Sequence, residues 1–163
     1  MTHQHGAAPS PPHAGVRFPP PLLYVAGIVA GLALHRAWPL QITAGASIAR
    51  SVTAAICLVG YVVIFVGAFA GFRRARTTLI PNRPAAALVT TGPYRFTRNP
   101  MYVSLVLLYV AVTLFVNSWW PVVLLPLVLV ATDRLVIAPE ERYLAAAFTA
   151  EYGAYRSRVR RWL

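Results

Sequence analysis

Two short polar segments carry the residue types best suited to chemistry. The first, residues 92–102 with the sequence GPYRFTRNPMY, lies between two long apolar stretches. The second is the adjacent pair Glu140-Glu141, which follows the next apolar stretch. The chain has only four acidic residues in all, so routine surface solvation does not explain why two of them stand side by side there. The two segments are therefore the first candidates for a functional site.

In the first segment, Asn99 and Pro100 are typical of a helix start, because asparagine caps free backbone amides and proline is tolerated at the first helical position. That explanation does not cover Tyr94, Arg98 and Tyr102. A helix N-terminus carries partial positive charge and unpaired N–H donors, so with Arg98 beside it this end suits a carboxylate or a phosphate. An anion-binding site is one hypothesis, and a plain helix start is the other.

The glutamate pair suits a cation, because two carboxylates at the edge of an apolar stretch would hold an ammonium group. One alternative is a plain helix start, with Pro139 in the first turn and the acids near the positive end of the helix. Another is that the preceding helix continues through Pro139 with a kink, which leaves the carbonyl of Leu135 without its usual partner. In a continuous helix, Asp133 would share a face with Glu140, seven residues further on.

Asp133 and Arg134 lie near the end of the apolar stretch before the glutamate pair. An ionisable group at such a place is by default a functional candidate. The alternative is a plain charge balance between Asp133 and either Arg134 or Arg142.

Composition indicates a membrane protein. Of the 163 residues, 58% are hydrophobic and 12% are charged, and the mean hydropathy is +0.59, outside the usual range of soluble domains. All 15 basic residues are arginine, and a net charge of +11 would suggest nucleic acid in a soluble protein. Here the arginines flank apolar segments, as at cytoplasmic membrane borders, so we expect no nucleic-acid partner. The single cysteine, Cys57, lies in an apolar run, so we expect no disulfide and no Cys-based metal site.

The predicted fold is an all-α integral membrane protein with four transmembrane helices and a C-terminal cytoplasmic amphipathic helix. A histidine- and proline-rich tail, residues 1–21, is expected to be disordered, and the rest, 22–163, forms one domain. The predicted spans are about 22–38, 48–72, 100–116 and 119–138. Gly27 with Gly31 and Gly67 with Gly71 have the spacing for close helix approach, within one chain or across a dimer seam. We therefore expect a monomer or a weak homodimer.

Loop charges predict the orientation. The segment between the second and third spans holds six arginines, whereas the other two joins hold few or none. Both termini are then cytoplasmic, and the segment 92–102 and the glutamate pair lie at the same membrane face. A pocket there with an anion-binding end and a cation-binding end would suit a zwitterionic amino acid group. The chain has no Gly-rich phosphate loop and no HExxH helix, which excludes several classes of soluble enzyme.

Longer runs around these residues resemble a known superfamily. They are LVTTGPY at 88–94, RNPMY at 98–102 and EERYL at 140–144, followed by Phe148, Glu151-Tyr152, Tyr155 and residues 159–161. In order and spacing, they resemble the integral-membrane isoprenylcysteine carboxyl methyltransferase and phospholipid methyltransferase superfamily. The resemblance covers the C-terminal half of the chain, while the N-terminal half matches only as generic spanning helices.

The resemblance implies a bacterial-type short member of the inner membrane that uses S-adenosylmethionine, bound at the cytoplasmic side. The acceptor would be a lipophilic small molecule or a lipid-linked group that enters from the surrounding membrane lipid. The carried-over cofactor-binding residues are Ala86, Ala87, Leu88, Val89, Tyr94, Asn99, Pro100, Met101, Tyr102 and Glu140, in the segments 86–102 and 139–161. Arg98 and Glu141 are candidates for positioning the reactants, Arg134 and Tyr152 are candidates for the substrate side, and no metal is expected.

Three positions depart from the family pattern. Asn99 stands where histidine is common, and Phe148-Thr149 replaces a common Phe-Gly, which should alter only a local turn. Val136 stands where eukaryotic members have an arginine that contacts the acceptor. The resemblance implies first a methyltransferase similar to isoprenylcysteine carboxyl O-methyltransferase, with a phospholipid amine or a thiol as the alternative acceptors, and Val136 leaves the identity of the acceptor open. Two competing hypotheses are an NADPH-dependent reductase of the sterol reductase type and a non-enzymatic membrane scaffold.

Overall fold

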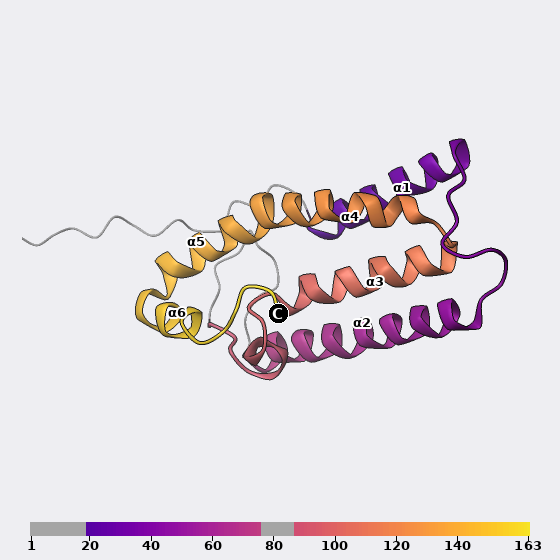
Figure 1. The fold of residues 1–163 in the computed structure, drawn as a ribbon. Helices are drawn as coiled ribbons and strands as arrows, with labels where there is room; N and C mark the ends of the chain where they lie inside the picture. Colours follow the sequence, from indigo (N-terminus) through magenta and orange to yellow (C-terminus); the bar gives the residue numbers. More distant parts are fainter. Residues whose placement is uncertain (1–18, 76–86) are drawn as a thin grey trace, which may run out of the picture.

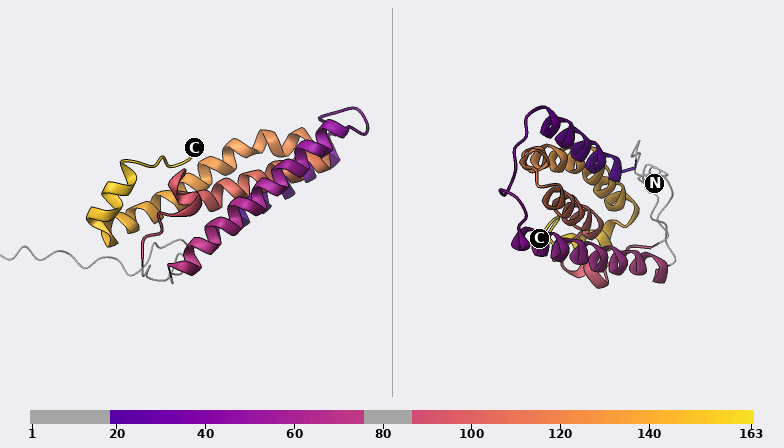
Figure 2. Two further views of the ribbon diagram at one scale, coloured as in Figure 1. Left: turned by 90° about the horizontal axis from the view of Figure 1, so that it is seen from below. Right: turned by 90° about the vertical axis from the view of Figure 1, so that its right-hand side faces the viewer.

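A bundle of four antiparallel helices forms most of the computed structural model, which describes residues 19–75 and 87–163. The four helices are α1 (Pro21–Ala37), α2 (Ile48–Arg74), α3 (Pro100–Val116) and α4 (Trp119–Thr132). Figure 1 shows α3 in the middle of the bundle, with α2 on one side and α4 on the other, and α1 packed against α4. The two turned views in Figure 2 show the same order. All regular structure in the described parts is helical.

Length and composition make two helices suitable for crossing a membrane: α2, and the continuous helix Trp119–Ala147 that begins with α4. The other two, α1 and α3, are apolar but have 17 residues each, about 26 Å at 1.5 Å per residue. That is slightly less than the ~30 Å of a bilayer's hydrocarbon core. The expected disordered tail falls mostly on residues 1–18, which lie outside the described residues, and α1 begins at Pro21.

Beyond α4 the helix does not stop but changes its winding. A π-helical segment, η2 (Asp133–Ile137), leads directly into α5 (Ala138–Ala147). The N–H of Ala138 donates to the carbonyl of Asp133, five residues earlier. This wider turn accommodates Pro139, which lacks an N–H and would clash with a regular α-helical turn. The prediction that the helix continues through Pro139 is therefore confirmed, and the alternative of a new helix start there is wrong.

The expectation of one amphipathic helix after residue 139 is wrong. Phe148 leaves the helical backbone conformation (φ −125°, ψ 42°), and a separate short helix, α6 (Thr149–Arg156), follows it. Residues 157–163 are mostly not helical and return toward the start of α3; we call them the C-terminal strap. The turn is stabilised because it buries Tyr152 and Tyr155, which are 2% and 5% exposed, against the rest of the site.

Glycines allow close packing at two places, both within the chain. A Cβ on Gly31 would lie 2.7–3.0 Å from atoms of Pro121, and one on Gly27 would lie 2.6 Å from Val128, so these residues let α1 approach α4. Gly67 and Gly71 face the segment before α3 instead of another long helix. These contacts account for both small-residue motifs without a dimer seam.

The turn between α3 and α4 also ties down the far end of the bundle. Asn117 adopts the left-handed backbone conformation, with φ 58°, which ends α3, and the Ser118 side chain caps α4. The Asn117 side chain accepts hydrogen bonds from the backbone of Ile42 and Thr43 in the α1–α2 connection. These contacts fix the end of the bundle opposite the C-terminal strap.

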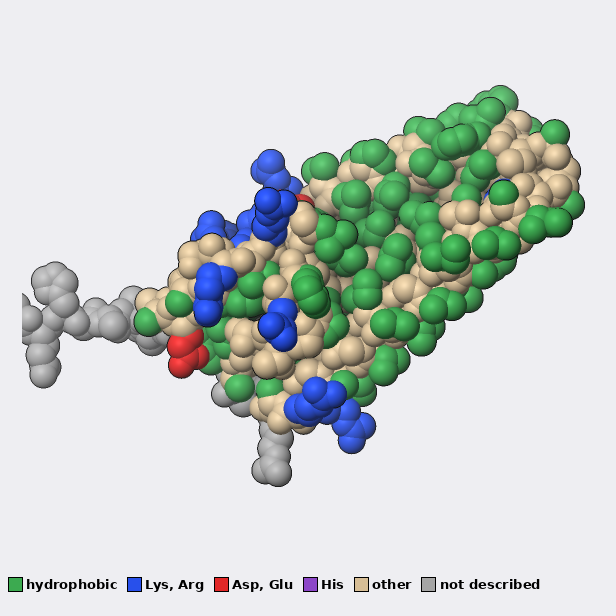
Figure 3. All heavy atoms as spheres, turned by 60° about the horizontal axis from the view of Figure 1, so that its bottom comes forward, with side chains coloured by type: hydrophobic (Ala, Val, Ile, Leu, Met, Phe, Trp, Pro, Cys, Tyr) green, Lys and Arg blue, Asp and Glu red, His purple; other side chains and the backbone are tan. Residues whose placement is uncertain are grey.

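Charged side chains gather at one end of the molecule. Figure 3 shows arginine and acidic side chains at the end where Figure 1 places α5 and α6, while most of the remaining visible face is hydrophobic. The apolar side chains exposed on the long helices include Val52, Ile56, Val63 and Leu127. An exposed apolar surface of this extent is expected of helices that face lipid. The candidate residues therefore belong to the polar end of the bundle.

Candidate functional site

The two neighbouring glutamates have different surroundings, and the difference begins with Tyr102. This residue lies in the first turn of α3, and its hydroxyl donates to both carboxylate oxygens of Glu140, at 2.9 and 2.8 Å. Glu140 is in α5, beyond the predicted end of the fourth span at residue 138. Burial raises its pKa to about 7, and the hydrogen bond from Tyr102 opposes that rise only in part. No arginine in the described parts of the chain forms an ion pair with Glu140.

Glu141, by contrast, is fully compensated. Its carboxylate, only 8% exposed, lies 2.8 Å from Nη2 of Arg98 and also binds the guanidinium of Arg161. Arg161 in turn contacts Asp133, at 3.1 and 3.2 Å. We call these four residues the ion cluster. Burial by itself raises the pKa of Glu141, but hydrogen bonds from Arg161 and Arg98 outweigh it and hold the pKa below its ordinary value.

The C-terminal strap completes the surroundings of the ion cluster. The backbone N–H of Arg98 donates to the carbonyl of Arg160 at 2.9 Å, and its guanidinium donates to the carbonyl of Val159 at 2.8 Å. The side-chain amide of Asn99 donates to the carbonyl of Arg161 at 2.9 Å. The strap therefore holds the loop that leads into α3.

These contacts correct two expectations about the start of α3. Asn99 is at the N-cap position, as predicted, but its side chain does not cap the helix, because its amide binds the strap. Arg98 is not free to bind an anionic ligand, because its side chain is 9% exposed and its guanidinium already contacts Glu141, the last carbonyl of α6 and a carbonyl of the strap. The anion-binding end that we expected at Arg98 is thus filled by the protein's own carboxylate.

A third correction concerns Asp133, which does not share a face with Glu140. The π-helical segment inserts one extra residue into a turn, so Asp133 aligns with the residue eight positions on. Both Asp133 and Glu141 consequently reach Arg161. The expected charge balance of Asp133 with Arg134 or Arg142 is also wrong, because its partner is Arg161 from the strap. Sequence reasoning gave Arg161 no role of its own, although residues 159–161 carried part of the family resemblance.

The remaining cofactor candidates line the approach to α3. Val89 and Tyr94, both 7% exposed, pack with Ala68 of α2, and Met101 packs against this group. Tyr94 belongs to a short 3₁₀ helix, η1 (Gly92–Arg95), and its carbonyl accepts a hydrogen bond from Tyr155 at 2.8 Å. Burial, the nearby Tyr155 and the negative Glu140 together raise the pKa of Tyr94. The other candidates in this region are Ala87 and Leu88, which are partly buried, Pro100, which is buried, and Ala86, which lies outside the described residues.

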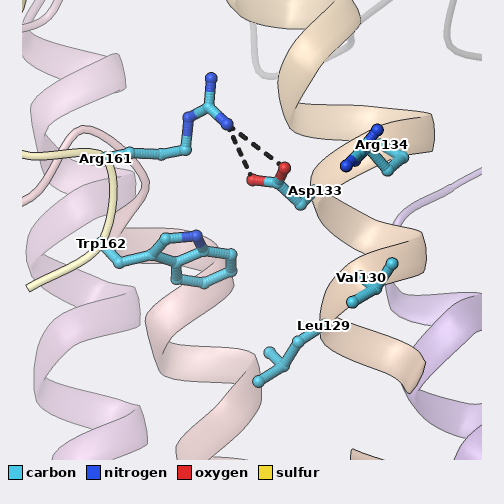
Figure 4. Close-up of a pocket in the computed structure, with 6 residues that line it drawn as sticks. All are labelled: Leu129, Val130, Asp133, Arg134, Arg161 and Trp162. Carbon is cyan, nitrogen blue, oxygen red and sulfur yellow. Dashed lines mark hydrogen bonds and ion pairs between the residues drawn. The ribbon is translucent and has the colours of Figure 1, made fainter. Parts of the chain in front are cut away.

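The structure does not bring the two substrate-side candidates together. Arg134 is exposed and lines an open hollow of about 460 Å³ at the end of α4. Figure 4 shows its lining, which is Leu129, Val130, Asp133, Arg134, Arg161 and Trp162. Tyr152 does not line the hollow; it is buried, and burial together with the negative charge of Glu141 raises the pKa of its hydroxyl to about 12. Neither Glu140 nor Tyr102 lines this hollow.

Taken together, the fold and the site define a helical protein with apolar, membrane-type helices and a polar site at one end of the bundle. A sequence profile described as phospholipid methyltransferase matches residues 48–151, which include α2, α3, α4 and most of the site. The chain therefore belongs to the phospholipid methyltransferase family, a part of the isoprenylcysteine and phospholipid methyltransferase superfamily. This family implies a membrane methyltransferase.

The comparison with curated proteins adds one relative from Haemophilus influenzae, described as an uncharacterized protein. It is 41% identical over 66 residues, which are 39% of this chain and 100% of the relative. No solved structure matches.

Proposed function

We propose that the protein is an S-adenosylmethionine-dependent methyltransferase that acts on a lipophilic acceptor in the membrane. One observation carries the choice of ligand: Glu140 is a partly buried carboxylate that binds the Tyr102 hydroxyl but no cation of the described chain. A buried carboxylate without a cation is costly unless a ligand supplies the charge. The ammonium group of an amino acid moiety has the charge and the hydrogen-bond donors that Glu140 lacks.

The residues of the site fit such a ligand at the cation end. Glu140 would bind the ammonium group, with Tyr102 holding the carboxylate in place. The buried group of Val89, Tyr94 and Met101 would supply the apolar contacts. When bound, S-adenosylmethionine supplies an activated methyl group on a sulfonium. The chain's own contribution is to position the two reactants and exclude water, which accounts for much of the rate in transfers of this kind.

The acceptor is the finer part of the proposal. The phospholipid methyltransferase match favours a phospholipid amine, while the sequence resemblance also includes carboxylate and thiol acceptors. Val136 is fully buried and packs with Tyr102 and Ile137, so it offers no cation to an acceptor carboxylate. Glu141 is held ionised by two guanidinium groups and is a poor base, so an amine acceptor would lose its proton to solvent. The family match and the absence of a cation at Val136 make the amine acceptor our first choice.

We further propose that all four helices α1–α4 cross the bacterial inner membrane, with the site and both termini on the cytoplasmic side. The apolar surface of the bundle and the charges gathered at one end support this placement. A reporter fused after Leu163 tests it. Activity of the reporter on the cytoplasmic side is expected, and activity on the opposite side would refute the topology.

Binding and transfer are tested separately on the full chain in detergent micelles. Calorimetry with S-adenosylhomocysteine and with NADPH distinguishes a methyltransferase from a sterol-type reductase, and we expect binding of the first only. Radiolabelled S-adenosylmethionine is then incubated with vesicles that contain phosphatidylethanolamine, a prenylcysteine or a lipophilic thiol. Label in the phosphatidylethanolamine fraction is the expected result. Binding of NADPH alone would refute the proposal, and no labelled product with any acceptor would favour a non-enzymatic scaffold.

A further inference from the structure

We propose that Arg161 and Asp133 are positioning residues. Through the ion cluster they compensate the charge of Glu141, so that Glu140 is the one of the two adjacent glutamates that receives a ligand's cation. This inference rests on the proposed function for the identity of the ligand. The arrangement of charges, however, can be tested without any ligand. Three features of the molecule support it: the placement of the strap, the register of the helix, and the net charge beside Glu140.

The strap places Arg161 by means of the backbone, and the placement is tight. The carbonyl of Arg161 accepts two hydrogen bonds from the loop before α3, one from the Thr97 hydroxyl at 3.1 Å and one from the Asn99 amide at 2.9 Å. Trp162 next to it packs against the buried group of Tyr102, Val136 and Ile137. With the backbone fixed in this way, the Arg161 guanidinium points toward α4 and η2, as Figure 4 shows for its contact with Asp133.

The π-helical segment supplies the register. Because η2 contains one extra residue in its turn, Asp133 and Glu141 lie on one face and share the Arg161 guanidinium. Glu140 consequently turns away from the cluster, toward Tyr102. In a regular α-helix, Asp133 would align with Glu140 instead, and the Arg161 guanidinium could not bind both Asp133 and Glu141. The wider turn thus separates the glutamates into a compensated and an uncompensated one.

The charges beside Glu140 are balanced. The ion cluster contains two carboxylates and two guanidiniums, so its net charge is zero. Among the described residues, Tyr102 is the titratable group that contacts Glu140, and its hydroxyl donates to the carboxylate as a neutral group. Loss of the Arg161 charge would leave the ion cluster with one net negative charge, and loss of the Asp133 charge would leave it with one net positive charge. The two changes should therefore shift the titration of Glu140 in opposite directions.

The test exploits the small number of glutamates, which are Glu140, Glu141 and Glu151. Carboxyl-labelled glutamate gives three NMR signals in the full chain, and Glu140→Gln identifies one of them. In the unaltered protein, Glu140 should titrate near pH 7. We expect Arg161→Gln to raise the midpoint and Asp133→Asn to lower it, each by roughly one pH unit.

Matched variants separate positioning from general disruption. Arg160→Gln removes an exposed guanidinium from the adjacent residue and should shift the midpoint little, because its charge is screened by water. Arg161→Lys keeps the charge and should restore a midpoint near that of the unaltered protein. If Arg161→Gln does not fold, Asp133→Asn still tests the inference, because the Glu140 midpoint should then fall.

Ligand affinity provides a second readout at pH 7. If S-adenosylhomocysteine binds only when Glu140 is ionised, a midpoint one unit higher weakens binding about fivefold and a midpoint one unit lower strengthens it about twofold. Opposite shifts for Arg161→Gln and Asp133→Asn support the inference. Shifts in the same direction, or no shift in either variant, overturn it. Absence of ligand binding in the unaltered protein would count against the proposed function alone, since the NMR titration stands without it.

Discussion

Replacing Glu140 with glutamine should make the ligand-free protein more stable and should lower its affinity for the ligand. Glutamine retains an acceptor for the Tyr102 hydroxyl, so the change removes mainly the buried charge. The difference between a folded pKa of about 7 and the ordinary 4.5 of glutamate corresponds to a gain of at most about 3–4 kcal/mol. A carboxylate–ammonium hydrogen bond is worth about 1.5–3 kcal/mol, so affinity for S-adenosylhomocysteine should fall about 10- to 100-fold.

The sign of the stability change depends on pH. The folded pKa of Glu140 lies above the unfolded value, so ionisation costs stability as pH rises from about 4.5 to about 7, and the full cost remains above that range. Thermal unfolding in detergent at pH 8 should therefore show a higher Tm for Glu140→Gln, by about 2–4 °C for each kcal/mol gained. At pH 4 the variant and the unaltered protein should unfold at nearly the same temperature.

Glu141→Gln is the matched control, with the opposite expected result. It removes a buried partner of Arg98 and Arg161, and breaking a buried ion pair on one side costs roughly 3–5 kcal/mol. Its Tm should fall at pH 8. A lower Tm for Glu140→Gln at pH 8, or unchanged affinity for S-adenosylhomocysteine, would refute the assignment of the two glutamates.

The same contacts, together with the packing of α1, support three more tests. Affinity of the unaltered protein for S-adenosylhomocysteine should rise between pH 6 and pH 8 with a midpoint at about 7, as Glu140 ionises, and a flat calorimetric profile would contradict this. Tyr102→Phe removes the hydrogen bond that lowers the pKa of Glu140, so the midpoint should move above 7, and a midpoint at or below 7 would be inconsistent with the geometry. Gly31→Ala would place a Cβ within 3.0 Å of the Pro121 backbone, and should cost about 1–3 kcal/mol, whereas Gly153→Ala meets no atom within 4 Å and should be neutral or slightly stabilising in thermal unfolding.

Much of the helical layout follows from the sequence, because a long apolar segment in a membrane can satisfy its backbone hydrogen bonds within itself only as a helix. The predicted ranges 48–72 and 100–116 correspond to α2 and α3, and the Asn117-Ser118 turn follows from residue types that tolerate a left-handed backbone and cap a helix. The C-terminal region was predicted less well. Its path depends on the burial of Tyr152 and Tyr155 and on the hydrogen bond from the Tyr155 hydroxyl to the Tyr94 carbonyl. Such contacts between distant segments leave no periodic signal in the sequence.

The candidate site was likewise predicted from the sequence only in part. Residue types alone singled out Glu140-Glu141, Arg98 and Tyr102, because adjacent carboxylates are conspicuous in a chain with four acids. Only the tertiary structure decided which glutamate pairs with arginines and which has no cationic partner within the described residues. That outcome depends on one extra residue in the turn of η2 and on an arginine twenty residues further along, Arg161, brought back by the strap. The wider turn has a local cause in Pro139, but the return of the terminal segment is not encoded locally, since it arises from packing and charge pairing between parts of the chain far apart in sequence.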